Sequence, residues 1–299
     1  ELPGRDFDEL KAAAVRRGFR AVPLGVLATA SVQNAVRHKR SPNFAGLMPG
    51  KDRPDEYVVY MAHWDHLGVG DGAEGDRIYN GAVDNATGIA GILTIARAYR
   101  EMLPGASRSV LFLAVTAEES GLLGSEYYAA HPLVPLERTA AVINIDALNP
   151  LGRAKDLEVV GFGASDLEDL LAGAAKSQGR TLKPDGKPEA GRYYRSDQFN
   201  FAKAGVPSLY VKSGTTLRDQ PAGAGQALLG EYEAGRYHKP GDEYSDAWDV
   251  SGTVEDLRLL FEVGALVANE KRWPEWRAGN EFRATREKSA KSREAKEEW

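Results

Sequence analysis

Two histidines and an aspartate follow the apolar run YVVYMA in this sequence. They are His63, Asp65 and His66, in a chain with five histidines among 299 residues. A strand usually ends in turn-forming residues, so imidazoles beside a carboxylate indicate chemistry at this point. Imidazoles and carboxylates are ligands that divalent zinc, cobalt and manganese accept. A single histidine at a strand end is more often a surface or core residue, so the prediction depends on what else lies nearby.

Five further candidates occupy comparable places along the chain. Glu118 and Glu119 follow the apolar run SVLFLAVTA, and Asp146 follows AAVINI. Asp84 precedes a helix-like stretch, and His238 lies in the turn-rich sequence YHKPGDE. Each has a structural explanation on its own, since a Glu-Glu pair is usually solvated and an aspartate before a helix is usually an N-cap. Their expected position at one end of a sheet favours a metal site.

The segments that must position these groups alternate between two patterns. Apolar runs of strand length suit central strands buried on both faces, and they cover residues 57–62, 109–117, 140–147, 157–162 and 207–213. Helix-like segments cover residues 6–18, 86–101, about 121–130, 165–178, 196–204 and about 253–270. This alternation predicts an α/β fold with a mixed, mostly parallel central sheet and helices on both faces. In such sheets functional groups gather beyond the carboxyl ends of the strands.

The composition excludes several classes of function. Lysine and arginine number 38 against 43 aspartates and glutamates, a net charge of −5, and no basic region indicates nucleic-acid binding. No apolar run approaches the roughly 20 residues of a membrane span. The chain has no cysteine, which excludes disulfides, thiolate nucleophiles and cysteine-type zinc sites. Any metal must therefore be held by histidine, aspartate and glutamate.

In combination these motifs resemble those of the M28 peptidases, a family of di-zinc aminopeptidases and their relatives. The resemblance covers roughly residues 55 to 250, in the family's order. HWDHLG resembles the HxD signature, GAVDNATG the D-x-x-[ST]-G segment, TAEESGLLGS the Glu-Glu motif, NIDALN the NxD motif and YHKPGDE the final histidine. The resemblance implies the zinc-exopeptidase, or phosphorylase/hydrolase-like, fold. It also implies a cis non-proline peptide bond between Asp84 and Asn85.

The same resemblance implies a set of metal ligands. It implies two zinc ions bridged by Asp84, with cobalt or manganese able to substitute. His63 and Asp146 would hold one ion, and Glu119 and His238 would hold the other. A bridging water of lowered pKa would then be the nucleophile.

Residues around these ligands receive supporting roles. Asp65 would orient His63, because a ligating imidazole usually donates its other N–H to a carboxylate. Glu118 would be the general base, since it adjoins a ligand without being needed as one. His66 is interpreted as a structural residue of the turn HLGVGDG.

Substrate-binding candidates are less specific. The segment RYYRSDQF resembles the family's S-D-H segment near the substrate pocket, with Gln198 where histidine is common. Tyr194, Arg195 and Asp197 are candidate substrate-binding residues, although a helix cap explains them equally well. Residues 223–235 are interpreted as a glycine-rich loop that overhangs the site.

The expected function is a metal-dependent exopeptidase that removes the N-terminal residue of peptide substrates. A carboxypeptidase of the same fold would need a basic pocket, for which Arg192 and Arg195 are the candidates. A glutaminyl cyclase of this fold would use one zinc. A non-catalytic binding domain is disfavoured, because all five ligand positions are retained.

Three regions are expected along the chain: an N-terminal segment (1–50), an M28-like peptidase domain (51–270) and a charged tail (271–299). Family members of this type are often exported and carry a protease-associated domain, for which this chain lacks room. The chain begins at Glu1 without a signal segment. We therefore expect the catalytic part of an exported, periplasmic or extracellular precursor. The sequence gives no indication of the oligomeric state.

Overall fold

The structure of the chain, a computed structural model, describes residues 4, 6–71 and 75–297. It divides into two compact units, Glu1–Arg40 and Ser41–Trp299. The first unit contains helix α1 (Phe7–Ala14), whose N-cap residue Asp6 accepts a hydrogen bond from the Glu9 N–H. The second unit contains the groups discussed below. No helix in the described residues is long and apolar enough to cross a membrane.

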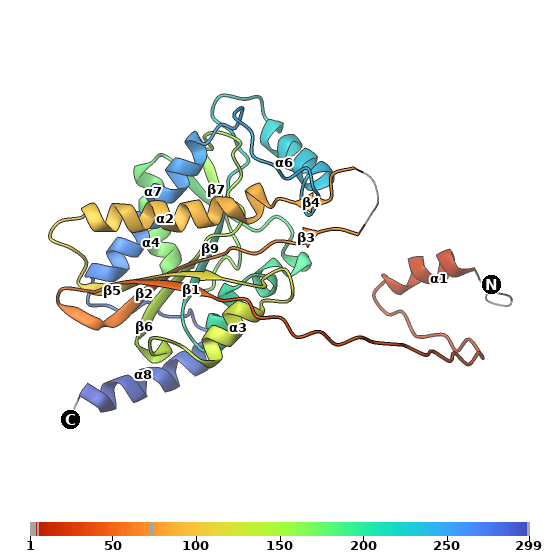
Figure 1. The fold of residues 1–299 in the computed structure, drawn as a ribbon, viewed down its shortest axis with the longest axis horizontal. Helices are drawn as coiled ribbons and strands as arrows, with labels where there is room; N and C mark the ends of the chain where they lie inside the picture. The colour runs from red at the N-terminus through yellow and green to blue at the C-terminus, as the bar shows by residue number, and fades with distance from the viewer. Residues whose placement is uncertain (1–3, 5, 72–74, 298–299) are drawn as a thin grey trace. The chain divides into compact units, whose positions relative to one another are not determined.

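Among the described residues, seven strands form the mixed sheet at the centre of the second unit (Figure 1). In spatial order they are β1 (Phe44–Met48), β5 (Arg108–Val115), β2 (Arg53–His63), β6 (Thr139–Asn144), β9 (Ser208–Ser213), β7 (Asp156–Val159) and β8 (Thr181–Pro184). Strands β5, β2, β6 and β9 are parallel, β1 is antiparallel to β5, and β7 is antiparallel to β9 and parallel to β8. The mixed, mostly parallel sheet predicted from the sequence is confirmed.

Helices cover both faces of this sheet, as expected. Strand β2 is buried on both sides, with Val58, Tyr60 and Ala62 in one apolar cluster and Val59 and Met61 in another. Helices α2 (Thr87–Glu101), α4 (Leu167–Ser177) and α7 (Ser251–Asn269) contribute to the first cluster. Helices α3 (Leu123–Ala130) and α5 (Gln198–Lys203) contribute to the second. Successive side chains of β2 thus point to opposite faces of the sheet, as they do in any β-strand.

Some elements differ from the sequence prediction. The segment interpreted as a glycine-rich loop is helix α6 (Ala224–Gly235), because its alanine, leucine, glutamine and glutamate residues favour a helix despite the glycines. The short hairpin of β3 (Gly68–Val69) and β4 (Ile78–Tyr79) was not expected from the sequence. Strand β8 was likewise missed, because it is short and carries lysine and proline.

Part of the region expected to be a charged tail is packed into the fold. Trp276 and Phe282 form an apolar cluster with Ala202 of α5. Arg286, in helix α8 (Arg283–Glu297), is buried and donates hydrogen bonds to the carbonyl groups of Thr139 and Ala140. Aromatic and arginine side chains within a charged sequence therefore anchor it to the edge of the core.

Close packing of α7 on β2 gives a test of this core. A Cβ atom on Gly264 would lie 1.8 Å from the Tyr60 hydroxyl oxygen, which donates to the Leu260 carbonyl. We expect Gly264→Ala to lower the free energy of unfolding by about 1–3 kcal/mol through overpacking. Gly230→Ala is the control, since no atom lies within 4 Å of a Cβ there, and it should leave stability equal or higher. Urea unfolding of the metal-free proteins measures both, and equal stability of the two variants would contradict this packing.

Candidate metal centre

The predicted site residues converge at one edge of the sheet. Parallel register pairs His63 at the end of β2 with Val115 of β5, and Met61 of β2 with Asn144 of β6. The segments that follow these three strands therefore begin side by side, as expected at the carboxyl edge of a parallel sheet. Asp84 reaches the same edge from the turn Ala82–Ala86 that enters α2.

One group of potential ligands comprises His63, Asp84 and Asp146, here called the first donor group. The Nε2 atom of His63 lies 3.1 Å from Asp84 Oδ1 and 3.6 Å from Asp146 Oδ1. The His63 side chain is 1% exposed, and its Nε2 has no hydrogen-bond partner. A buried nitrogen aimed at two carboxylates without a hydrogen bond fits a shared cation.

A second group comprises Asp84, Glu119 and His238, here called the second donor group. The Nε2 atom of His238 lies 3.3 Å from Asp84 Oδ2 and 3.1 Å from Glu119 Oε2. Asp84 thus has one carboxylate oxygen in each group. His66, interpreted from the sequence as structural, also lies here, with Nδ1 2.8 Å from Glu119 Oε1. The five predicted ligands are therefore all brought together.

The donor atoms fit zinc in type and spacing. Ligands about 2.0 Å from a tetrahedral zinc ion lie about 3.3 Å from one another. The distances between neighbouring donors in the two groups run from 3.1 to 3.6 Å. These residues therefore have the donor types and spacing that could hold divalent cations.

The clustered charges perturb the acids and bases of the site. Burial would lower the pKa of His63, but the carboxylates of Asp146 and Asp84 outweigh burial and raise this pKa well above its usual value. Burial likewise opposes ionisation of Asp84, yet His238 and His63 hold its pKa below the usual range. For Glu118, burial and the nearby charge of Asp146 raise the pKa to about 9. The pKa of His238 is raised too, chiefly by its contact with Asp84, so without cations the protonated forms of His63, His238 and Glu118 are all favoured.

Asp65 supports the site differently from the predicted arrangement. The Nδ1 atom of His63 pairs with the backbone carbonyl of Asp65 at 3.1 Å, and the Asp65 carboxylate is 3.7 Å away. That carboxylate instead accepts the backbone N–H groups of Glu118 and Glu119, at 3.0 and 3.3 Å. A single residue therefore positions the imidazole through its backbone and the Glu-Glu pair through its side chain.

Asp242 is a supporting residue that the sequence reasoning missed. Its buried carboxylate accepts hydrogen bonds from the backbone N–H groups of Val83 and Asp84, at 3.1 Å each, and from the Tyr232 hydroxyl. These bonds hold the turn that carries Asp84, where the Asp84–Asn85 peptide bond is cis, as the resemblance implies. The available signal was an acidic residue four positions after His238 in YHKPGDE.

Asp146 also has partners that were missed or left undecided. Its Oδ2 atom accepts hydrogen bonds from Ser196 Oγ at 2.6 Å and from the Tyr210 hydroxyl at 3.4 Å. With Oδ2 occupied in this way, Oδ1 is directed toward His63. Ser196 lies in the segment RYYRSDQF, so that segment supports the site by holding the side chain of Asp146.

A cavity of about 380 Å³ opens beside the donors, a size typical of small-molecule sites. Glu118, Asp84 and Asp146 line one part of it. Other lining residues are Lys187, Arg192, Arg195, Lys212, Leu229, Tyr232, Glu233 and Tyr237. The acid predicted as general base therefore borders a space that a substrate can enter.

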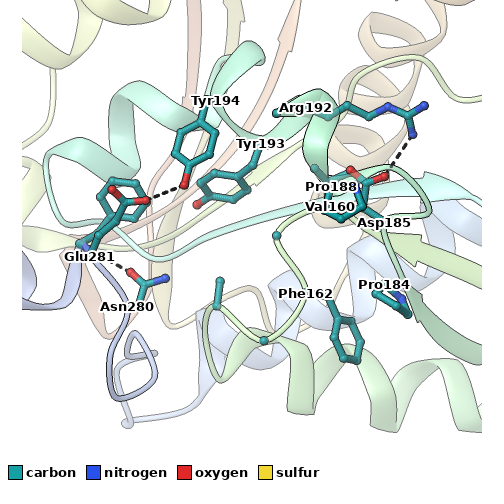
Figure 2. Close-up of a pocket in the computed structure, with 15 residues that line it drawn as sticks. Val160, Phe162, Pro184, Asp185, Pro188, Arg192, Tyr193, Tyr194, Asn280 and Glu281 are labelled. Carbon is teal, nitrogen blue, oxygen red and sulfur yellow. Dashed lines mark hydrogen bonds and ion pairs between the residues drawn. The ribbon is translucent and has the colours of Figure 1, made fainter. Parts of the chain in front are cut away.

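The predicted substrate-binding residues are distributed over three environments. Arg195 lines the cavity beside the donors. Tyr194 lines a separate cavity of about 400 Å³, where its hydroxyl donates to Glu281 at 2.8 Å (Figure 2). Asp197 is fully buried and accepts a hydrogen bond from Ser125 Oγ at 2.6 Å. Asp197 lines neither of these two cavities, and its role in substrate binding stays a prediction.

Comparison with known proteins identifies the family. The model of peptidase family M28 matches residues 43–261, a span that contains all five predicted ligands. The chain belongs to peptidase family M28. Within the family match, the side chains that meet in the structure are those that follow the three strands, Asp84 and the final histidine.

Sequence relatives of this M28 chain have both aminopeptidase and carboxypeptidase names. Aminopeptidase NAALADL1 of Mus musculus is 35% identical over 129 residues, which is 42% of this chain and 16% of the mouse protein. A glutamate carboxypeptidase 2 homolog of Caenorhabditis elegans is 27% identical over 194 residues, 62% of this chain and 23% of that protein. The matched segments are thus a minor part of these relatives.

Solved structures support the fold. The LapA aminopeptidase of Legionella pneumophila has a TM-score of 0.55 at 18% identity, over 77% of this chain and 55% of its own. BSAP, a zinc aminopeptidase from Bacillus subtilis, has a TM-score of 0.54 at 22% identity, over 81% of this chain and 53% of its own. The zinc-exopeptidase architecture expected from the resemblance is therefore confirmed.

The hydrogen bonds of Asp242 lead to a prediction about metal retention. In Asp242→Asn an amide replaces a carboxylate that accepts N–H groups, so the turn carrying Asp84 loses part of its support. We expect zinc affinity to fall by about 10–100-fold, as is typical for groups that orient ligands. Equilibrium dialysis against zinc measures the change. Asp246→Asn is the control, because Asp246 is exposed and bonds to Tyr244, and equal affinities in the two variants would contradict this role.

Proposed function

We propose that this chain is a metal-dependent exopeptidase that hydrolyses the N-terminal peptide bond of peptides with two zinc ions. The ions would be held by the first and second donor groups and shared through Asp84. The observation that carries the proposal is the position of Glu118, on the cavity wall beside donors that are themselves paired with histidines. Membership in family M28 and the named relatives support hydrolysis of peptides.

The chemistry divides between the metal and the protein. Zinc, when bound, polarises the scissile carbonyl as a Lewis acid and makes water more acidic. Glu118 takes a proton from the attacking water while the water oxygen bonds to the carbonyl carbon. When the carbon–nitrogen bond breaks, Glu118 returns that proton to the leaving amine. In the metal-free site burial raises the pKa of Glu118, which makes its carboxylate a stronger base for the water's proton.

The backbone around Glu118 fixes its direction. Asp65 accepts the N–H groups of both Glu118 and Glu119, so the base and the adjacent ligand are held in a constant relation. Glu119 turns toward His238, and Glu118 borders the cavity. The two neighbouring glutamates therefore have separate tasks despite identical side chains.

A carboxypeptidase reaction is the second candidate, favoured by the basic residues of the same cavity. Lys187, Arg195 and Lys212 line it, and none has an ion-pair partner within 4.0 Å among the described residues. Arg192, expected from the sequence to be a basic-pocket residue, is instead paired with carboxylates, among them Glu158 at 3.1 Å. Three unpaired cations would attract the C-terminal carboxylate of a short peptide.

The general base is tested by Glu118→Gln. We expect this variant to keep its zinc content and lose about 10²–10⁴-fold in kcat, because the amide cannot accept the water's proton. The measurements are zinc content by atomic emission and hydrolysis of an aminoacyl-p-nitroanilide. Glu126→Gln is the matched control, since Glu126 is exposed on α3, directly after the segment TAEESGLLGS that contains Glu118. Near wild-type kcat in Glu118→Gln would exclude Glu118 as the base.

The polarity of the reaction is tested with matched substrates. We expect zinc-loaded enzyme to cleave a free-amine tripeptide and its C-terminal amide, and to leave the N-acetylated form intact. Cleavage of the acetylated peptide with loss of activity on the amide would support the carboxypeptidase instead. Chelation should abolish either activity, and added zinc or cobalt should restore it. Activity that survives chelation would contradict both candidates.

Export to the periplasm or the extracellular space remains part of this proposal. Detection of the protein in culture medium or a periplasmic fraction would support it. Recovery from the cytosol alone would contradict it.

A further inference from the structure

We propose that His66 is a direct ligand in the second donor group, which would then bind its cation through four protein side chains. This inference rests on the metal-binding part of the proposed function. The ring of His66 is nearly enclosed, with its side chain 7% exposed. One atom each of His66, Asp84 and Glu119 lie within 4.8 Å of one another. These three side chains can therefore reach a common ion, and His238 Nε2 lies 3.3 Å from Asp84 and 3.1 Å from Glu119, the two carboxylates of the same group.

The geometry between His66 and Glu119 favours a shared cation over a direct hydrogen bond. Although Nδ1 lies 2.8 Å from Glu119 Oε1, neither atom has a hydrogen-bond partner. The ring N–H direction thus misses the oxygen, and hydrogen bonds weaken steeply as their angle narrows. Two donor atoms this close together without a hydrogen bond between them have the spacing of neighbouring ligands of one ion.

Burial without partners makes a purely structural role costly. Both ring nitrogens of His66 are buried and lack a hydrogen-bond partner in the described structure. A buried polar group that has lost its water and gained no partner destabilises the fold. Coordination through Nδ1 would satisfy one of these nitrogens, which packing alone does not.

The chain makes room for this imidazole at Gly81. A Cβ atom on Gly81 would lie 2.7 Å from His66 Cγ, and Gly81 has a φ of 62° that disfavours other residues. The β3–β4 hairpin connects the two positions, since β3 begins soon after His66 and β4 ends just before Gly81. The hairpin and the glycine together bring His66 beside the turn that carries Asp84.

A fourth ligand would make the two cation positions unequal. Zinc sites closed by four protein ligands are typically structural, whereas catalytic sites keep an open position. The second donor group with His66 has four ligands, and the first donor group has three. The ion at the second position would then be held more tightly, and the open coordination would belong to the position of His63 and Asp146.

The cysteine-free sequence gives a direct test. In cobalt-loaded His66→Cys, a thiolate bound to the metal would produce a near-ultraviolet charge-transfer band that wild type cannot have. Nδ1 is the ring nitrogen nearer the backbone, so a cysteine sulfur can approach the same position. His131→Cys is the control, because His131 is an exposed histidine whose Nδ1 pairs with the Tyr127 carbonyl. We expect the band in His66→Cys alone.

Zinc titration of His66→Gln provides the second readout. We expect one of two zinc affinities to fall by more than about 100-fold, beyond the 10–100-fold typical of groups that only orient a ligand. Circular dichroism of the metal-free proteins checks folding. If His66→Gln does not fold, His66→Cys decides alone.

The outcomes separate this inference from the proposed function. Wild type that binds two zinc ions, with no band in His66→Cys, would overturn the role of His66 and leave the proposed function intact. A weaker zinc affinity without a band would likewise overturn direct ligation, since it would mean that His66 orients Glu119. Wild type that binds no zinc would contradict the proposed function itself.

Discussion

Electrostatic repulsion at one sheet edge is the constraint on which the site depends. Asp84, Glu119 and Asp146 converge within a few ångströms of the histidines, in surroundings where burial disfavours charge. Carboxylates so close together cannot all ionise without compensating positive charge. Without cations, the raised pKa values of His63 and His238 favour positively charged imidazoles, and the raised pKa of Glu118 favours a neutral carboxyl group. Two divalent cations would replace the protons of these groups and satisfy the same requirement.

Two carboxylates outside the donor groups, the partly buried Asp65 and the buried Asp242, determine where the ligands lie. Asp65 binds the backbone of the Glu-Glu pair, and Asp242 binds the backbone of the turn before Asp84. Both carboxylates accept hydrogen bonds from backbone N–H groups, so they restrain the main chain that carries the ligands. Loops are the variable parts of most folds. Here these hydrogen bonds give the loop of Glu118 and Glu119 and the turn of Asp84 the fixed geometry that a metal site needs.

Much of this arrangement could be predicted from the sequence. Continuous apolar runs predicted the central strands, and the polar residues that follow them predicted which groups would meet, because strand ends of a parallel sheet share one edge. The contacts of Asp65, Asp242 and His66 could not be predicted. They depend on where backbone N–H groups and a hairpin lie in space, which residue order does not specify. Helix α6 was missed because its glycines outweighed the helix-forming residues in the interpretation, and the buried part of the C-terminal region was hidden by its charge.

The charge of the cavity bears on how a substrate would be oriented. Two dications carry four positive charges, and the carboxylates of Asp84, Glu119 and Asp146 carry three negative ones, so the loaded donor groups would retain a net positive charge. The cavity is also lined by Lys187, Arg195 and Lys212, and Glu233 lies 3.7 Å from Arg192. A free substrate amine would then find complementary charge at the acidic lining residues Glu118 and Glu233, and a free carboxylate would find it at the three basic side chains. A short peptide with both ends unblocked would match this distribution better than a long chain, because the carboxylate of a long peptide would lie outside the cavity.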